Sequence, residues 1–279
     1  MELDKKVSFA VDLLKSAAEM ADKHGQVLEI SYSGGKDSDV ILDLAKMANI
    51  PYEPIYKVTT IDPPGTEKHA RDNGATVLMP TETFAQLVGR KGLPNRFRRF
   101  CCEVLKEYRV RDYAVIGVRR DESKKRADRY KEPEVCKVYS KTEKVRQYLP
   151  LLDFTQQDVE DYVNMRGLRL HPHYYDEDGN LHVERRLGCV GCPLGYWKHR
   201  EKEFLKYPGF IKVYLRGMRQ YFGSHPQSNL HTYFPNIYAW FCFYLYCDTL
   251  KEFRDKFSAC LGNPNDFQKY LEERFQINL

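Results

Sequence analysis

The sequence predicts an α/β fold with a parallel sheet, followed by a helical, cysteine-bearing C-terminal region. Three observations lead to this prediction. Short apolar runs alternate with runs of helical spacing in the first half of the chain, and this alternation is typical of parallel sheets. A glycine-rich segment follows the first apolar run. Beyond a turn at 188–195 that contains glycine and cysteine, the pattern is helical and strongly aromatic to the end.

The predicted elements follow one another in the order that this fold requires. Apolar residues at helical spacing predict a helix over 5–24, and Gly25 is its stop signal. Thr155 and Asp158 approximate a capping box at the start of a later helix. Strands are expected at 27–32, 53–59, 75–79 and 113–118. Helical runs at 40–47 and 67–73 separate the first three of these strands.

Composition places the chain among ordinary globular proteins. Of its 279 residues, 42% are hydrophobic and 30% are charged, which excludes collagen-like, mucin-like and wholly disordered chains. We divide the chain into an α/β domain over 1–170 and a helical region over 171–279. Lys and Arg outnumber Asp and Glu by 44 to 39, a net charge of +5, and this mild excess suits a protein that handles phosphates.

Neither a secretory signal nor a membrane span is expected. The N-terminal residues Met1–Lys6 are charged and lead into an amphipathic pattern. The segment Leu230–Cys247 lacks charged side chains, but it contains Pro235 and falls short of the ~20 apolar residues that cross a bilayer. We expect a buried helix there and a cytoplasmic protein without membrane partners. In a reducing compartment, the eight cysteines are better interpreted as metal ligands or redox groups than as disulfides.

A glycine-rich loop between the first predicted strand and the next helix is the strongest functional signal. Adjacent glycines let the backbone turn sharply and approach a ligand closely. The amides at a helix start bind phosphate oxygens, Lys36 adds a positive charge, and Ser33 and Ser38 add hydroxyl groups. The alternative is a glycine turn with a chance lysine, which the full hexapeptide between strand and helix disfavours.

This hexapeptide, Ser-Gly-Gly-Lys-Asp-Ser, resembles the pyrophosphate-binding loop of the adenine-nucleotide α-hydrolases, and in particular of the iron–sulfur branch of the phosphoadenosine phosphosulfate (PAPS) reductase family. The resemblance covers about 26–200. It implies a Rossmann-like parallel sheet that binds ATP or another adenylate, with Mg²⁺, and it implies catalytic roles for Lys36 and Asp37. By position, the phosphate contacts would be Ser33, Gly34, Gly35, Lys36, Asp37 and Ser38.

A second matching element runs from Gly117 to Ser123 and continues to Arg126. The strand expected to end at residue 118 places Arg119 at its carboxyl end, where α/β sheets bind ligands. A guanidinium group can grip a phosphate or sulfate with two hydrogen bonds. A solvated charged loop is the alternative. The resemblance implies that Arg119 and Arg126 contact the nucleotide and that Arg119 is also catalytic.

Two further segments are weaker signals. Thr59–Pro64 follows the second predicted strand and resembles the Thr-x-Asp-Pro-Pro segment of a phage and bacterial branch of the family, so Thr60 or Asp62 would contact the nucleotide or Mg²⁺. The same segment fits a turn stiffened by two prolines, without a ligand contact, equally well. The segment His171–Tyr175 has two histidines separated by proline and no evident third metal ligand. We expect it to be a loop that lines the site.

Four cysteines form two close pairs. Cys101 and Cys102 are adjacent, and Cys189 and Cys192 lie in a glycine-containing C-x₂-C turn. Four thiolates suit either a [4Fe-4S] cluster or tetrahedral zinc. The resemblance favours the cluster, since adenosine phosphosulfate (APS) reductases surround one with the same two pairs. It also leaves Cys136 as a substitute for Cys102.

The chain departs from the reductases at its end. Those enzymes carry a nucleophilic cysteine in a Glu-Cys-Gly-Leu-His tail, whereas this chain ends Phe275–Leu279 with Cys260 as the nearest thiol. We therefore expect an enzyme of sulfur metabolism that adenylates a substrate, releases pyrophosphate and transfers sulfur with the help of the cluster. A sulfur donor protein and a nucleic-acid acceptor are partners that the resemblance allows. The alternatives are a sulfonucleotide reductase that forms sulfite and a non-catalytic adenylate-binding iron–sulfur module.

Overall fold

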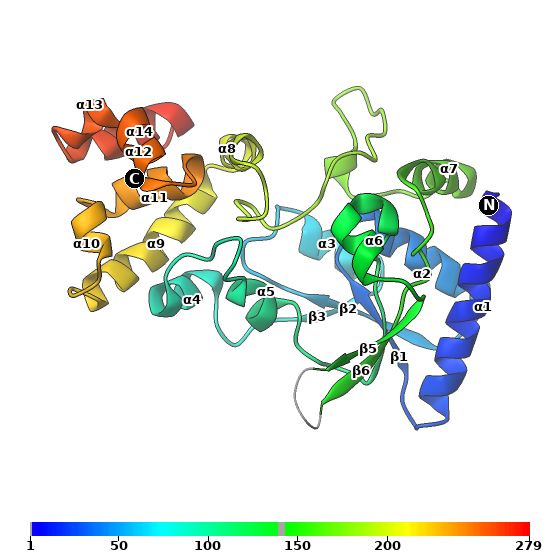
Figure 1. The fold of residues 1–279 in the computed structure, drawn as a ribbon. Helices are drawn as coiled ribbons and strands as arrows, with labels where there is room; N and C mark the ends of the chain where they lie inside the picture. The colour runs from blue at the N-terminus through cyan, green and yellow to red at the C-terminus, as the bar shows by residue number, and fades with distance from the viewer. Residues whose placement is uncertain (1, 139–142) are drawn as a thin grey trace. The chain divides into compact units, whose positions relative to one another are not determined.

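The computed structural model describes residues 2–138 and 143–279 (Figure 1). The chain forms two compact units, each built from separate stretches of sequence. The sequence suggested one boundary near residue 170, whereas the compact units alternate along the chain. Unit 1 comprises Met1–Val58, Pro64–Met79 and Glu107–Leu187, and unit 2 comprises Thr59–Pro63, Pro80–Lys106 and Gly188–Leu279.

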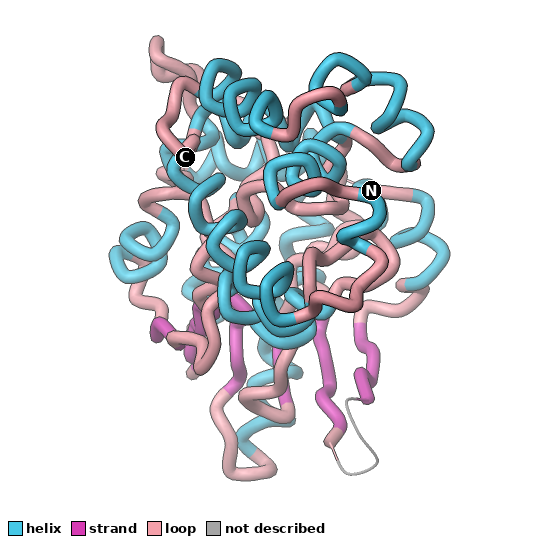
Figure 2. The backbone as a smooth tube through the Cα atoms, turned by 90° about the vertical axis from the view of Figure 1, so that its left-hand side faces the viewer, coloured by secondary structure: helices cyan, strands magenta, loops and turns pink. Residues whose placement is uncertain are grey.

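Unit 1 contains one six-stranded sheet in the order β3-β2-β1-β4-β6-β5. The pairs β1–β2, β1–β4, β2–β3 and β4–β6 are parallel, and only the β5–β6 pair among the described strands is antiparallel. In Figure 2 these strands, coloured magenta, run side by side. The predicted α/β class with a Rossmann-like parallel sheet is confirmed. The strands are β1 (Leu28–Tyr32), β2 (Tyr52–Lys57), β3 (Thr76–Leu78), β4 (Tyr113–Val115), β5 (Glu134–Val138) and β6 (Lys144–Tyr148).

The four predicted strands are present, each somewhat shorter than expected, and β5 and β6 were not predicted. Strand β5 alternates between exposed and half-buried positions and carries charged residues, so it lacks the apolar run that marks the buried strands. The helices of unit 1 are α1 (Leu3–Asp22), α2 (Lys36–Ala48), α3 (Thr66–Asp72), α6 (Lys124–Arg129) and α7 (Gln156–Arg166), with 3₁₀ turns η1 (Arg120–Glu122) and η2 (Pro172–Tyr174).

Helices α1 and α2 pack against each other and against β1, which buries one apolar core (Figure 1). Ala10 and Leu14 of α1, Ile30 of β1 and Leu44 of α2 are all fully buried in this core. Its amphipathic helices follow the predicted spacing. The predicted capping box is confirmed: the Thr155 side chain accepts a hydrogen bond from the Asp158 amide, and the Asp158 carboxylate accepts one from the Thr155 amide.

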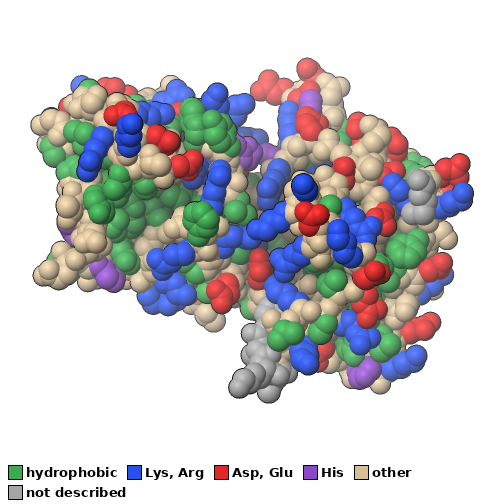
Figure 3. All heavy atoms as spheres, viewed as in Figure 1, with side chains coloured by type: hydrophobic (Ala, Val, Ile, Leu, Met, Phe, Trp, Pro, Cys, Tyr) green, Lys and Arg blue, Asp and Glu red, His purple; other side chains and the backbone are tan. Residues whose placement is uncertain are grey.

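The described part of unit 2 contains helices and loops, with an aromatic core. Tyr214 packs against Phe84, Phe204 and Phe241 with ring centroids 4.7–6.0 Å apart, distances typical of favourable aromatic pairs. On the face shown in Figure 3, hydrophobic side chains gather over α9 and α11. The helices are α4 (Phe84–Lys91), α5 (Phe100–Leu105), α8 (Trp197–Lys206), α9 (Gly209–Ser224), α10 (Leu230–Tyr233), α11 (Ile237–Tyr246), α12 (Leu250–Lys256), α13 (Ser258–Leu261) and α14 (Asn265–Phe275).

The charge-free segment 230–247 was expected to form one buried helix, but it is interrupted, and Pro235 lies at the break. It forms α10 and α11, and most of α11 is buried. None of the helices among the described residues has the length and apolar character that crossing a membrane requires.

Helices α4 and α9 approach each other closely, and this contact draws segment 80–106 into unit 2. Gly217 of α9 allows the approach. A Cβ atom there would lie 2.5 Å from the Ala85 carbonyl oxygen and 2.8 Å from Cβ of Val88.

We expect Gly217→Ala to lower the free energy of unfolding by about 1–3 kcal/mol, the usual range for overpacking. Gly223→Ala in the same helix is the matched control, because no atom lies within 4 Å of the added Cβ, and alanine favours a helix. Chemical denaturation of both variants measures the difference. Equal stability of the two variants would contradict the close packing.

Candidate functional site

The loop between β1 and α2 has the geometry of a sharp, close-packed turn. Gly34 has φ +75°, a left-handed conformation that favours glycine. A Cβ atom at Gly34 would also lie 2.8 Å from Cγ2 of Thr66, the first residue of α3. Both observations restrict this position to glycine, and they explain the first glycine of the hexapeptide.

The second half of the hexapeptide forms the start of α2. Gly35 is the N-cap residue, and the Ser38 hydroxyl donates a hydrogen bond to its carbonyl oxygen at 2.7 Å. The Ser33 and Ser38 hydroxyls lie 3.3 Å apart. The loop therefore presents two hydroxyl groups beside the amino end of a 13-residue helix, where the helix dipole favours an anion.

Tyr174 of η2 meets this helix start. The Lys36 amide donates a hydrogen bond to the Tyr174 hydroxyl at 3.2 Å, and the Lys36 ammonium lies 5.6 Å from the centre of the tyrosine ring. Burial raises the pKa of Tyr174 to about 12. Tyr174 therefore remains a neutral hydroxyl at physiological pH. The segment 171–175 does line the loop, as expected, although it forms a 3₁₀ turn.

The three residues predicted to be catalytic lie together. The Asp37 carboxylate lies 3.4 Å from the Lys36 ammonium and 2.8 Å from Nε of Arg119. Arg119 is only 3% exposed and also lies 3.4 Å from the carboxylate of Asp121. The parallel sheet explains this meeting, because β1 and β4 are neighbours and their carboxyl ends share one edge.

Arg126 is engaged elsewhere in the same unit. Its guanidinium pairs with the Glu122 carboxylate, and its amide donates to the Ser123 hydroxyl at 3.3 Å, which caps α6. Its predicted nucleotide contact stays a prediction.

A buried cluster of Tyr32, Asp39 and His69 lies behind the loop and was missed by the sequence analysis. Nε2 of His69 lies 3.0 Å and 3.2 Å from the two Asp39 carboxylate oxygens, and the Tyr32 hydroxyl donates to the same carboxylate. Burial raises the pKa of Asp39 above its usual range, and the hydrogen bonds from His69 and Tyr32 offset only part of this effect. No local pattern signals the cluster, since its members come from β1, α2 and α3.

In unit 2, the four predicted metal ligands surround one small cavity of about 20 Å³. It is lined by Cys101, Cys102, Cys189 and Cys192 together with Lys106. The Arg99 guanidinium donates to Sγ of Cys102 at 3.4 Å. The pKa of Cys101 is raised by its hydrogen bond to Cys102, by burial and by the other two sulfurs. Four thiols with a shared electrostatic environment therefore converge beside basic groups.

Lys106 links this cavity to Asp62. Burial alone would lower the pKa of Lys106, but Cys189 and Asp62 outweigh burial and raise that pKa above its usual range. The Lys106 ammonium lies 3.5 Å from the Asp62 carboxylate. Burial raises the pKa of Cys189, and the positive charge of Lys106 offsets part of this effect. The sequence analysis did not single out Lys106.

The side chains of Thr60 and Asp62 both accept hydrogen bonds within unit 2. Thr60 has φ +63°, which is unusual for a β-branched residue, and its hydroxyl accepts a hydrogen bond from the Phe84 amide at 2.9 Å. The Asp62 carboxylate accepts from the Thr59 amide at 2.7 Å. Their contact with a nucleotide or Mg²⁺ stays a prediction.

Cys136 belongs to unit 1, whereas the other four candidate ligands belong to unit 2. It is exposed on β5 of unit 1 and is not among the residues that line the cysteine cavity. Across 2–138 and 143–279, no group of three or more His, Cys, Asp or Glu side chains is arranged to hold a single metal ion.

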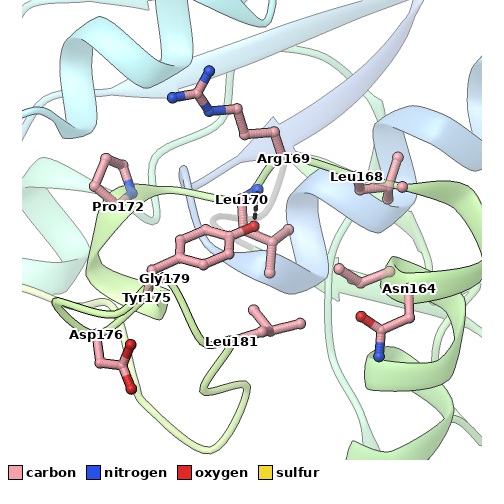
Figure 4. A pocket seen from close by; sticks show the side chains of 11 residues that line it. Asn164, Leu168, Arg169, Leu170, Pro172, Tyr175, Asp176, Gly179 and Leu181 are labelled. Atoms are coloured by element: carbon pink, nitrogen blue, oxygen red, sulfur yellow. Dashed lines mark hydrogen bonds between the residues drawn. The ribbon is translucent and has the colours of Figure 1, made fainter.

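Unit 1 also contains a pocket of about 820 Å³ beyond the end of α7, which none of the predicted site residues line (Figure 4). Leu168, Leu170 and Leu181 give it an apolar wall, and the Leu170 amide donates to the Tyr175 hydroxyl at 3.2 Å. Asp176 at its edge accepts hydrogen bonds from the amides of Asp178 and Asn180, so this carboxylate holds the loop together.

Comparison with known proteins decides the family. The sequence profile described as "Phosphoadenosine phosphosulfate reductase domain" matches residues 28–194, more than half of the chain. The chain belongs to the PAPS reductase family. The match spans the phosphate loop, Arg119 and both cysteine pairs, and the family is named for an enzyme.

Individual relatives are more distant. The chain is 27% identical over 237 residues to the uncharacterized protein MJ0973 of Methanocaldococcus jannaschii, which covers 79% of this chain and 54% of the relative. The chain thus spans about half the length of that curated relative.

Solved structures resemble the chain only distantly. FMN adenylyltransferase of Candida glabrata, in complex with FAD and inorganic pyrophosphate, has a TM-score of 0.43 and 16% identity, covering 68% of this chain and 65% of that one. The PAPS reductase of Candida auris, in a phosphate complex, has a TM-score of 0.38 and 15% identity, covering 61% and 88%.

The raised pKa of Asp39 predicts a specific pH dependence. Between the ordinary carboxyl pKa near ~3.9 and the raised value in the fold, the folded state binds more protons than the unfolded state. The free energy of unfolding therefore falls as pH rises through this window. Asp39→Asn cannot titrate, so it should gain stability relative to the unsubstituted protein as pH rises above the ordinary carboxyl pKa.

Asp43→Asn is the control of opposite sign on the same helix. Burial alone would raise the pKa of Asp43, but hydrogen bonds from Arg166 and Tyr162 lower it. The unsubstituted protein should therefore gain stability over Asp43→Asn as pH rises. Denaturation curves at several pH values measure both differences. Parallel pH profiles for Asp39→Asn and the unsubstituted protein would contradict the assignment.

Proposed function

We propose that this protein binds ATP at the β1–α2 loop of unit 1 and uses it to adenylate an oxygen of an acceptor, as a step in sulfur transfer. The observation that carries the proposal is the arrangement of Gly34, the start of α2 and the Lys36–Asp37–Arg119 group. It supports a site for a polyphosphate, because amides, hydroxyls and two cations meet at the carboxyl edge of a parallel sheet.

The chemistry follows from the charges at this edge. The acceptor oxygen attacks the α-phosphorus of ATP, the bond between the α- and β-phosphates breaks, and pyrophosphate leaves with the electron pair. Lys36, the loop amides and Mg²⁺ would stabilise the charge on pyrophosphate. Arg119 would hold the α-phosphate side, and Asp37 would orient both cations. A sulfur nucleophile from a donor protein then displaces AMP from the acceptor.

The cysteine cavity of unit 2 supports a [4Fe-4S] cluster held by Cys101, Cys102, Cys189 and Cys192. A [4Fe-4S] cluster takes four thiolate ligands, and the four cysteines around this cavity supply that number. Lys106 and Arg99 would offset its negative charge. When bound, the cluster would supply redox or sulfur chemistry.

The family match favours a second candidate, the reduction of APS or PAPS to sulfite. That reaction needs a thiolate to attack the sulfate sulfur. Cys260 of α13 is the thiol nearest the chain end, but burial and Asp266 raise its pKa, and a raised pKa lowers the thiolate fraction. The raised pKa of Cys260 therefore favours adenylation over sulfonucleotide reduction.

We expect Lys36→Ala to weaken the binding of Mg–ATP roughly 10- to 100-fold, since a hydrogen bond to a charged group contributes about 1.5–3 kcal/mol. Lys46→Ala is the matched control, because Lys46 is an exposed lysine near the end of the same helix. Isothermal titration calorimetry measures both variants. Equal affinity in the Lys36→Ala variant would exclude this loop as the phosphate site.

Assays of pyrophosphate and of sulfite, together with the same calorimetry, separate the two reactions. Release of pyrophosphate from ATP supports adenylation and excludes a purely binding role. If the protein binds APS or PAPS but not ATP, and forms sulfite, the second candidate replaces the first.

We expect protein purified without oxygen to contain iron and sulfide and to absorb broadly near ~400 nm. Cys189→Ser should lose most of this absorbance and iron, because it removes one of four ligands. Cys260→Ser is the control and should retain both, and Cys136→Ser tests the substitute ligand. A colourless protein that carries zinc would contradict the cluster.

A further inference from the structure

Unit 2 contains a second pocket that the proposed chemistry does not use. It has a volume of about 410 Å³, and the residues that line it include Arg96, Phe97, Arg200 and Phe243. All of its lining residues belong to unit 2. Its composition of two arginines and several aromatic rings distinguishes it from the phosphate loop and from the cysteine cavity.

Arg200 is the most informative residue of this pocket. It is 7% exposed, and its guanidinium lies over the Tyr244 ring, 5.2 Å from the ring centre. The Nε atom of Arg200 is buried and makes no hydrogen bond to any described residue. A buried donor without a partner costs free energy, so Arg200 keeps a hydrogen-bonding capacity that the described residues do not use.

Phe97 provides an aromatic surface at the same pocket. Its side chain is 97% exposed, so both faces of the ring are open to a ligand. The Asn95 side chain accepts hydrogen bonds from the amides of Phe97 and Arg98, both at 2.9 Å, and this turn presents the ring. Phe97 is therefore displayed by a defined turn beside Arg96.

The charges of the pocket limit the ligand further. Arg96 and Arg200 carry two positive charges, and Asp248 contributes one carboxylate. The net charge of +1 matches a phosphodiester, which carries one negative charge. A carboxylate at the edge can also accept a hydrogen bond from the amino group of a base. Exposed aromatic rings beside arginines are a common way to stack unpaired bases.

The pocket also adjoins the cysteine cavity. Pro193 lines the pocket and follows Cys192 directly. The Tyr244 hydroxyl, below the Arg200 guanidinium, donates a hydrogen bond to the Gly191 carbonyl oxygen at 2.6 Å. A ligand here would therefore lie next to the C-x₂-C turn.

We propose that this pocket binds one nucleotide unit, with its base on Phe97 and its phosphate on Arg200 and Arg96. The inference does not depend on ATP binding at unit 1. The unit can come from a single-stranded nucleic acid or from a free mononucleotide, and the net charge of the pocket favours the strand.

The test uses fluorescence anisotropy with fluorescein-labelled 15-nucleotide single strands of mixed sequence, one DNA and one RNA, and calorimetry with AMP. The protein carries Lys36→Ala so that the unit 1 loop is impaired in every sample. We expect Phe97→Ala to weaken binding of a strand about 5- to 150-fold, the range for loss of one stacked base. Tyr233→Ala removes another exposed aromatic side chain of unit 2 and should leave binding unchanged.

Salt dependence gives a second readout. Arg96→Gln should reduce the slope of log affinity against log salt by about 1, and Arg200→Gln should weaken binding strongly. If Arg200→Gln fails to fold, Phe97→Ala and Arg96→Gln still decide the question, because their side chains lie at the pocket surface. Binding of AMP alone, sensitive to the same variants, assigns the pocket to free nucleotides. Absence of binding to all three probes, or binding that Phe97→Ala and Arg96→Gln leave unchanged, overturns the proposal.

Discussion

The left-handed turn at Gly34 is the constraint on which the nucleotide side of the protein depends. It lets β1 lead into α2 while α3 packs within a distance that no other side chain would allow. With the turn fixed, Lys36, Asp37 and Ser38 must lie at the start of α2. The parallel sheet then brings the end of β4 beside them, so Arg119 reaches Asp37 without a long connection. A single backbone requirement thus orders a group of charges that follow the carboxyl ends of β1 and β4.

In unit 2, sulfur atoms from segments that are distant in the sequence line one cavity. Cys101 and Cys102 come from α5, and Cys189 and Cys192 come from the turn before α8. Hydrogen bonds from Tyr214 to the Val190 carbonyl oxygen and from Tyr244 to that of Gly191 tie the turn to the aromatic core. Lys106 then provides the charge that a set of thiolates needs. Packing and electrostatics therefore act on the same few residues.

Local sequence patterns were sufficient to predict part of the fold and part of the candidate site. The strand–loop–helix at 28–48, the capping box at Thr155 and the helical character of the C-terminal region were predictable because each depends on neighbouring residues. The antiparallel pairing of β5 with β6, the Asp39–His69 pair and Lys106 were not, because burial and long-range contacts define them. The alternation of the two units along the chain could not be predicted for the same reason. The packing of α4 on α9 leaves no signal in either segment alone.

A crystal structure with α,β-methylene ATP and Mg²⁺ tests the central claim most directly, because this analogue cannot be cleaved between the α- and β-phosphates. The account predicts that the β- and γ-phosphates bind the loop 33–38 and the Lys36 ammonium, with Arg119 beside the α-phosphate. An analogue bound elsewhere, with the loop free of phosphate, would contradict it.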